Sequence, residues 1–346
     1  MLKRLLQALL LCLPFSALAA DYPVGNAERF HVPGHERYWR GAAEPGLRIM
    51  VWYPAASGSP VRRIDYPPFE GIGIAENATP IPGRRPLVVM SHGTGGSAAS
   101  LAWIAGALAA QGYIVAAPNH PGNNALAPLT GDGFLLWWER AADLGDVIDF
   151  MLADPVFAPV IDRERIGALG YSLGGYSVLA LAGARTDRDG FLAFCRSADA
   201  DATCTPPEMD GRLSQPSAGS AASLARSAGS FRDPRVRAVF AIAPALGKAF
   251  SKEGMIEVTV PVEIVAGDAD VAVPPATNAQ RIAGLLPSAH LRMLPGAGHP
   301  TFLDLCLPDA AAPDLCRDGA GVDRAEIHRA TVDLARAFFA GILGPP

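Results

Sequence analysis

The sequence predicts an α/β protein in which a mostly parallel sheet is covered by helices on both faces. Long apolar runs, typical of strands that are buried on both sides, alternate along the chain with amphipathic helical patterns. The chain has 346 residues, of which 50% are hydrophobic and 18% charged, so it can bury one large core. We expect one main domain over residues 21–346, interrupted by one insertion.

The individual elements follow from the spacing of apolar residues. Apolar runs predict strands at residues 47–54, 86–92, 113–120, 165–171, 237–244, 261–268 and 289–296. Helical patterns follow at about residues 100–112, 137–152, 278–286 and 323–339, and after the turn at residue 172. In the helix at 137–152, Leu144, Val147 and Ile148 lie on one face, as in an amphipathic helix. The Pro- and Gly-rich stretch from Ser57 to Arg85 predicts a long surface connection.

Residues 185–232 break this alternation. The segment is rich in Ser, Ala, Gly, Asp and Pro and has few large apolar residues, so it cannot form a core of its own. We expect an insertion over the edge of the sheet at which the parallel strands end. It acts there either as a lid or as a flexible loop without further consequence.

Residues 1–20 have the pattern of a secretory signal peptide. Two basic residues precede an apolar stretch over residues 5–13, and small residues end the segment at Ala19. A membrane anchor is the alternative, but a spanning helix needs roughly 20 apolar residues. Cys12 follows Leu11, where a lipoprotein site needs a small residue. We therefore predict a protein exported to the periplasm or the extracellular space, with no stable membrane span after the signal is removed.

Four cysteines remain after that cleavage, namely Cys195, Cys204, Cys306 and Cys316. An even number is consistent with disulfides in an oxidising compartment, and three pairings can be drawn. We favour Cys195–Cys204 and Cys306–Cys316, because the partners are close in sequence and lie in loop-like stretches. A metal site would need tighter Cys-x-x-Cys spacing and nearby histidines, so we expect no metal and no other cofactor.

The net charge of −5 and the lack of a Lys/Arg-rich run argue against nucleic acid or an anionic membrane as a partner. A small molecule is the expected partner. The sequence does not indicate an oligomeric state.

The stretch GYSLGGY, residues 170–176, has the pattern of a nucleophile elbow. Ser172 stands between glycines at the junction of a predicted strand and a predicted helix. A hydroxyl is a poor nucleophile, so an enzyme must expose it, supply a base and stabilise the oxyanion that forms. The same G-x-S-x-G pattern also arises by chance in a chain with 36 glycines, but the flanking strand and helix favour the catalytic interpretation.

A Ser-acid-His order then requires an acid and a histidine later in the chain. Asp270 follows the strand at 261–268 in a turn that can reach an imidazole, and Asp268 is the alternative, with a turn-capping role as its other interpretation. His299 follows the last strand in the small-residue loop PGAGHPTF. His290 begins a predicted strand and His328 lies in the closing helix, so His299 is the expected base.

The oxyanion hole needs two backbone N–H donors. Leu173 follows the predicted nucleophile, and Thr94 lies in the SHGTGG turn after an earlier strand. We expect these two residues to donate, and His92 to be a structural hydrogen-bonding residue. His120, Trp137 and Trp138 are candidates for a substrate pocket, although the tryptophans would equally fit a role in anchoring their helix in the core.

Six segments together carry a family resemblance, and they occur in the order VVMSHGTGG, VAAPNHPGN, WWERAADLGDVIDF, GYSLGGYSVL, VAGDADVAVP and PGAGHPTF. Over residues 47–339 the chain resembles α/β-hydrolases of the dienelactone hydrolase-like and platelet-activating-factor acetylhydrolase-like group. The resemblance implies the α/β-hydrolase fold, a Ser172, Asp270 and His299 triad, and oxyanion donors at Thr94 and Leu173. Dienelactone hydrolase itself uses a cysteine nucleophile, so this chain departs from that substrate chemistry.

The expected function is that of an exported serine esterase that acts on short-chain or lipid-like carboxylic esters. A serine peptidase or amidase would use the same triad, and a non-catalytic binding protein would keep only the scaffold. Residues 93–98 also match a dinucleotide-binding fingerprint, but no acid stands at the end of the next strand to bind a ribose. A metallohydrolase is disfavoured, because His92 and His120 lack clustered carboxylate and histidine partners.

Overall fold

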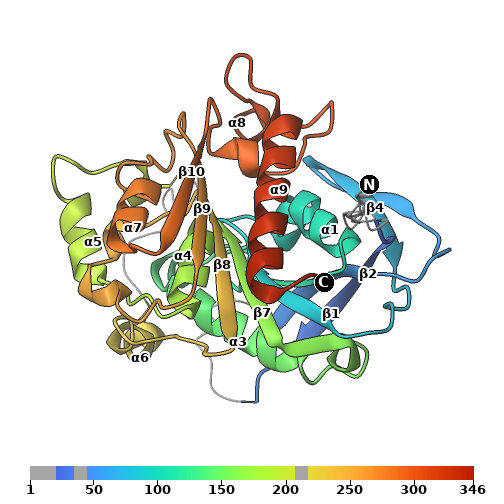
Figure 1. Cartoon of the computed structure of the whole chain (residues 1–346). Helices are drawn as coiled ribbons and strands as arrows, with labels where there is room; N and C mark the ends of the chain where they lie inside the picture. Colours follow the sequence, from blue (N-terminus) through green and yellow to red (C-terminus); the bar gives the residue numbers. More distant parts are fainter. Residues whose placement is uncertain (1–20, 35–44, 207–216) are drawn as a thin grey trace, which may run out of the picture.

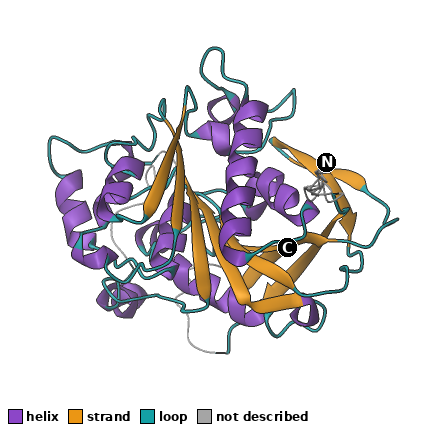
Figure 2. Cartoon of the chain, in the orientation of Figure 1, coloured by secondary structure: helices purple, strands orange, loops and turns teal. Residues whose placement is uncertain are grey.

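The computed structural model describes residues 21–34, 45–206 and 217–346, which form a ten-stranded sheet with helices packed on both faces (Figures 1 and 2). The strand order is β10-β9-β8-β7-β5-β6-β2-β1-β4-β3. The predicted fold class, a mostly parallel sheet between two layers of helices, is confirmed. The predicted signal peptide lies outside the described residues. No helix in the described ranges is long and apolar enough to cross a membrane.

The parallel part of the sheet contains six of the seven predicted strands. It consists of β5 (Arg85–Ser91), β6 (Ile114–Asn119), β7 (Ile161–Tyr171), β8 (Val236–Ile242), β9 (Val262–Gly267) and β10 (Ala289–Leu294). β2 (Leu47–Pro54) runs antiparallel to β6, and β1 (Val24–His31) runs antiparallel to β2. Because β5 to β10 are parallel, the loops that follow them meet at one edge of the sheet, where ligands bind in sheets of this kind.

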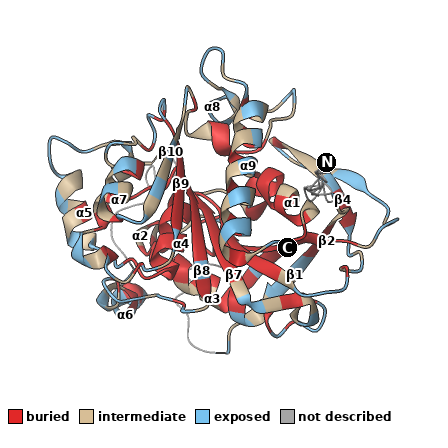
Figure 3. Ribbon diagram, in the orientation of Figure 1, coloured by how far each residue is buried: buried red, intermediate tan, exposed pale blue. Residues whose placement is uncertain are grey.

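The helices divide between the two faces (Figure 1). α1 (Ala102–Ala110) and α9 (Arg324–Leu343) pack together on one face, while α3 (Glu139–Met151) and α4 (Leu173–Leu181) pack together on the other. α7 (Ala279–Leu285) lies against β9 and β10. The central strands are buried between these layers (Figure 3), which explains their continuous apolar runs.

The expected surface connection over residues 57–85 is wrong, because the structure has a β-hairpin there. β3 (Arg62–Tyr66) and β4 (Phe69–Glu76) are joined by a turn at Pro67 and Pro68, and β4 adds to the sheet beside β1. The hairpin forms because apolar residues such as Ile72 and Ile74 alternate with small or polar ones, and this face packs on the core. The prolines form the turn and the glycines lie within β4, so neither residue type prevents the two strands from forming.

The insertion over residues 185–232 contains α5 (Arg188–Cys195) and α6 (Ala221–Ala225), with residues 207–216 outside the described ranges. Its second part is tied to the start of α3. The Trp138 Nε1–H donates to Ser223 Oγ at 2.9 Å, and Arg226 pairs with the buried carboxylate of Glu139. These contacts anchor α6 on the main domain, while the proposed lid function remains a prediction.

Candidate active site

Ser172 occupies a strained turn between β7 and α4. Its φ of 57° and ψ of −120° lie outside the usual regions for a non-glycine residue. The flanking glycines explain how the turn fits. A Cβ at Gly170 would lie 2.1 Å from the Gly174 carbonyl oxygen, and one at Gly174 would lie 1.9 Å from the Ser91 carbonyl oxygen. Side chains at either position would collide with backbone, so only glycine allows the sharp reversal that presents the serine.

The structure brings Ser172, His299 and Asp270 into one hydrogen-bonded relay. His299 Nε2 lies 2.9 Å from Ser172 Oγ, and His299 Nδ1 lies 2.7 Å from Asp270 Oδ2. A carboxylate can only accept, so Nδ1 donates and Nε2 is left to accept the serine proton. Ser172 and Asp270 are buried, while the His299 side chain is 14% exposed. The arrangement can generate a serine nucleophile and return a proton to a leaving group.

The two aspartates in the loop after β9 make different contacts. Asp270 is held by the Val273 N–H, which donates to its Oδ1 at 2.7 Å, and its second oxygen faces His299. Asp268 instead accepts a hydrogen bond of 2.6 Å from the Gly296 N–H. This contact links the loops after β9 and β10, so Asp268 has the turn-capping role that was the alternative to its being the acid.

His299 is also held from its backbone and its ring face. The Tyr171 hydroxyl donates to the His299 carbonyl oxygen at 2.9 Å, and the two rings stack with centroids 4.9 Å apart. Thr301 Oγ1 accepts from the Gly298 N–H at 3.0 Å and donates to Asp318 at 2.7 Å. The loop is therefore fixed on both sides of the imidazole.

The two predicted oxyanion donors lie next to Ser172. Leu173 directly follows Ser172 and is the first residue of α4. Thr94 follows Gly93, and a Cβ added at Gly93 would lie 3.2 Å from the Cβ of Ser172. Within the described part of the chain, neither backbone N–H donates a hydrogen bond to another group. The next amide is occupied, since the Gly95 N–H donates to Asn123 Oδ1 at 2.6 Å. Two N–H groups beside the serine thus remain available to a ligand oxygen.

The structure buries His120, Trp137 and Trp138, the three residues that were expected to line a substrate pocket. His120 and Trp138 have no exposed surface, and Trp137 packs against Trp138 and Phe191. Of the two alternatives for the tryptophans, anchoring in the core is the one the structure shows. Both ring nitrogens of the buried His120 contact buried side chains, those of Ser91 and Asp143.

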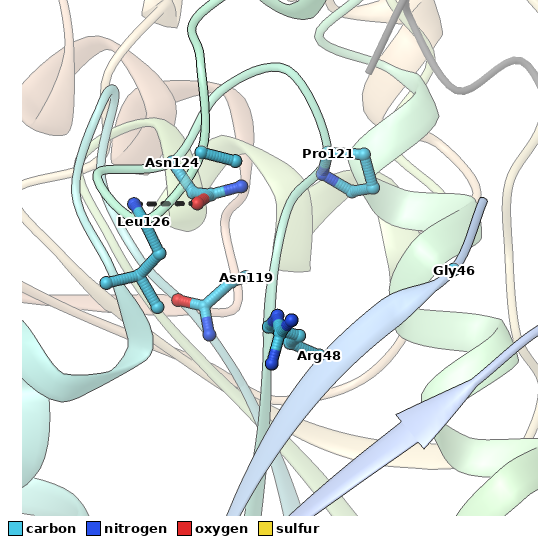
Figure 4. Close-up of a pocket in the computed structure, with 7 residues that line it drawn as sticks. Gly46, Arg48, Asn119, Pro121, Asn124 and Leu126 are labelled. Atoms are coloured by element: carbon cyan, nitrogen blue, oxygen red, sulfur yellow. Dashed lines mark hydrogen bonds between the residues drawn. The ribbon is translucent and has the colours of Figure 1, made fainter. Parts of the chain in front are cut away.

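A small pocket does lie beside the segment that carries His120 (Figure 4). Arg48 on β2 and Asn119 at the end of β6 line it, together with Asn124 and Leu126 in the following loop. Its volume of ≈ 20 Å³ has room for about one water molecule. An ester substrate therefore cannot be accommodated there.

Both disulfides have the pairing expected from the sequence. Cys195 bonds to Cys204, and Cys306 bonds to Cys316. The first closes a loop that contains Asp201. Asp201 accepts hydrogen bonds from Thr277 and Asn278, which follow the loop that carries Asp270, here called the acid loop. The second closes a loop that directly follows the segment containing His299 and leads to Asp318.

Tyr171 and Asp143 also belong to this region, although neither was predicted from the sequence. Tyr171 directly precedes the predicted nucleophile, and nothing in the sequence shows that its ring lies against His299. Asp143 gave a stronger signal. It stands four residues before Val147, on the apolar face of the α3 helix, where a charged residue must find a buried partner.

Comparisons with known proteins concern the family and the fold of the chain. The alpha/beta hydrolase family matches residues 88–313. A ferulic acid esterase from Streptomyces cinnamoneus shares the fold with a TM-score of 0.59 and 20% identity, over 94% of this chain and 92% of that one. A puromycin-hydrolyzing peptidase of Mycobacterium tuberculosis gives a TM-score of 0.52 and 14% identity, over 92% of this chain but 40% of that one. No curated protein sequence matches significantly.

Proposed function

The chain belongs to the alpha/beta hydrolase family, and we propose that it is a serine hydrolase that cleaves carboxylic esters through an acyl-enzyme intermediate. One observation carries the proposal. The hydroxyl of Ser172, in a strained elbow, faces His299 Nε2 at 2.9 Å, and Asp270 accepts from the opposite ring nitrogen at 2.7 Å. This is the arrangement that serine hydrolysis requires.

The proposed reaction proceeds in two halves. His299 takes the proton of Ser172 as the oxygen attacks the ester carbonyl, and it returns that proton to the alkoxide as the ester bond breaks. Water then attacks the acyl-enzyme, again with His299 as base, which releases the acid and restores the serine. Asp270 holds the ring and stabilises its cationic form in both halves.

The backbone N–H groups of Thr94 and Leu173 are the proposed donors to the oxyanion. Leu173 begins α4, so its N–H lies at the positive end of the helix dipole. Each such donor typically lowers the barrier by about 3 kcal/mol, because it is fixed in place before the negative charge develops.

Esters are proposed as substrates for two reasons. The motifs of this chain resemble those of the dienelactone hydrolase-like and platelet-activating-factor acetylhydrolase-like group, and the structural similarity to a ferulic acid esterase spans nearly all of both chains. The amide alternative uses the same groups, so it is decided by experiment. Export is proposed as well, because the two disulfides suit an oxidising compartment.

The test combines labelling with a substrate panel. An organophosphonate followed by peptide mass mapping should place the adduct on Ser172, and Ser172→Ala should abolish both the adduct and turnover. Ser59→Ala, in a turn before β3, is the matched control and should behave as the unmodified protein. Turnover of p-nitrophenyl esters of increasing acyl length, measured beside a peptide panel, identifies the substrate class. An adduct elsewhere would refute the nucleophile, and turnover of peptides alone would refute the ester assignment.

A further inference from the structure

A second Ser-His-Asp arrangement lies beneath the proposed oxyanion loop. His120 Nε2 lies 2.9 Å from Ser91 Oγ, and His120 Nδ1 lies 2.7 Å from Asp143 Oδ2. The three side chains come from the end of β5, the residue after β6, and α3, and none has exposed surface. A substrate cannot reach Ser91, so this arrangement does not serve as a second nucleophilic site.

The backbone of His120 connects this arrangement to a second histidine, His92. The His120 N–H donates to His92 Nε2 at 3.2 Å, so this nitrogen accepts and carries no proton. The proton of the neutral ring is then on Nδ1, which lies 2.7 Å from the Gly93 carbonyl oxygen and donates to it. Burial, together with the positive charge of Arg140, holds the pKa of His92 well below its usual range, so the ring remains neutral.

The Gly93 carbonyl belongs to the same peptide as the Thr94 N–H. A trans peptide is planar, and its C=O and N–H point in opposite directions. A hydrogen bond that fixes the carbonyl oxygen therefore also fixes the direction of the N–H. The Gly96 N–H approaches the same oxygen at 3.3 Å, and Asn123 holds the following amide, so the peptide is restrained from several sides.

We propose that His120 is a positioning residue: the contacts of its ring with Ser91 and Asp143 fix the place of its own backbone N–H against His92 Nε2, which keeps His92 in its Nδ1–H tautomer and thereby aims the Thr94 N–H at the substrate oxygen. The inference rests on the proposed function, because the Thr94 N–H matters only if an oxyanion forms beside Ser172. It adds a role for three buried polar side chains that otherwise take no part in the reaction.

The kinetic test compares an ester with its thionoester, in which sulfur replaces the carbonyl oxygen. Sulfur accepts hydrogen bonds weakly, so a thionoester gains little from an oxyanion hole. His120→Leu should lower kcat for the ester by about 100-fold with KM changed less than about two-fold, and lower kcat for the thionoester much less. His120→Asn can still donate to Asp143 and should recover part of the loss. Thr331→Val, a buried change on α9, should leave both rates unchanged.

Equal losses on the two substrates in His120→Leu would show general damage to the site and overturn the proposal, as would no loss at all. If His120→Leu does not fold, Ser91→Ala removes one of the two ring contacts and should shift the ester-to-thionoester ratio in the same direction. An unchanged ratio in a folded Ser91→Ala protein would then be the contradicting result.

A second measurement needs no substrate. Nitrogen-15 NMR of the histidine rings should show His92 protonated at Nδ1 and bare at Nε2 in the unmodified protein, and a mixture of tautomers in His120→Leu. A proton on Nε2, or an unchanged tautomer in the variant, would overturn the relay. If no ester is turned over and Ser172 is not labelled, the proposed function fails, while the tautomers still decide whether the relay exists.

Discussion

The phenol ring of Tyr171 lies against the imidazole of His299, with ring centroids 4.9 Å apart and ring planes 30° from parallel. The same tyrosine donates its hydroxyl proton to the His299 carbonyl oxygen. Tyr171, which directly precedes Ser172 in the chain, therefore also holds the proposed base, His299. The position of His299 depends on β7 as well as on its own loop.

Removing this ring should slow the reaction. Tyr171→Leu loses both the stacking and the hydrogen bond, and we expect kcat to fall roughly 10- to 100-fold with little change in KM, because a displaced base costs rate. Tyr171→Phe keeps the ring, so its kcat should fall only a few-fold. Steady-state kinetics on a p-nitrophenyl ester measure both effects.

Tyr176→Phe is the matched control for these variants. Tyr176 is a buried tyrosine on α4 whose hydroxyl bonds to Thr186 and whose ring stacks on Phe250, and within the described residues no hydrogen bond or ring contact joins it to His299. Its substitution should leave kcat unchanged. If Tyr171→Leu turns over substrate at the unmodified rate, the ring is not needed to hold the base.

The two aspartates after β9 should respond very differently to the same change. Asp270→Asn removes the charge that stabilises the imidazolium, and kcat should fall by about 10⁴-fold. Asp268→Asn changes only a cap on a turn, so its kcat should stay within a few-fold. Asp270→Asn combined with His299→Ala should be little worse than either alone, because the residues act as one unit. A crippled Asp268→Asn enzyme would reverse the assignment.

The sequence was informative where local patterns determine structure. The elbow glycines, the ordered acid and histidine, and the parallel strands all have short-range signatures, and the structure places Ser172 and Asp270 on the two ring nitrogens of His299. The hairpin of β3 and β4 was not predicted, because the many prolines and glycines of this stretch obscure the alternation of apolar and polar residues. The stacking of Tyr171 on His299 depends on how two loops far apart in the chain approach each other, which no local pattern records.

His120 was expected to line a substrate pocket, but the structure buries it. Its burial follows from Asp143 on α3, which approaches only when the helix packs on the sheet. Pairing between distant polar residues was the main information that the sequence did not supply.

Asp304 should make stability depend on pH. Burial, with a smaller contribution from Glu70, raises the pKa of its carboxyl to about 7, and its Oδ2 has no hydrogen-bond partner among the described residues. The folded state therefore binds this proton more tightly than the unfolded chain does. The folded protein should lose stability from this group as the pH rises from about 4 to about 7, by up to about 4 kcal/mol.

Asp304→Asn removes the titration, so its stability relative to the unmodified protein should increase as the pH is raised from 4 to 8. Chemical denaturation at several pH values measures this difference. Asp309→Asn, an exposed acid in the same region, is the control and should follow the unmodified protein. A constant difference between the Asp304→Asn and unmodified proteins across this range would contradict the expectation.

The two disulfides should affect different properties of the enzyme. Cys306–Cys316 closes the loop between the His299 segment and Asp318, and Asp318 accepts a hydrogen bond from Thr301, which in turn holds Gly298 beside the base. Replacing both cysteines by serine should therefore lower kcat by roughly 10- to 100-fold, because the imidazole loses part of its support. Each bridge should also contribute about 2–4 kcal/mol to stability.

The Cys195–Cys204 bridge lies in the proposed lid, and Asp201 between its cysteines accepts hydrogen bonds from Thr277 and Asn278, which follow the loop that carries Asp270. Replacing that pair by serine should change the preference for acyl length and KM more than kcat, since the lid would select substrates while the base remains in place. Kinetics across an acyl series, with folding checked by circular dichroism and pairing checked by non-reducing peptide mapping, compares the two double variants. If the Cys306/Cys316 variant keeps its kcat while the Cys195/Cys204 variant loses it, the roles are reversed, and Asp201 supports the acid loop more strongly than Asp318 supports the base.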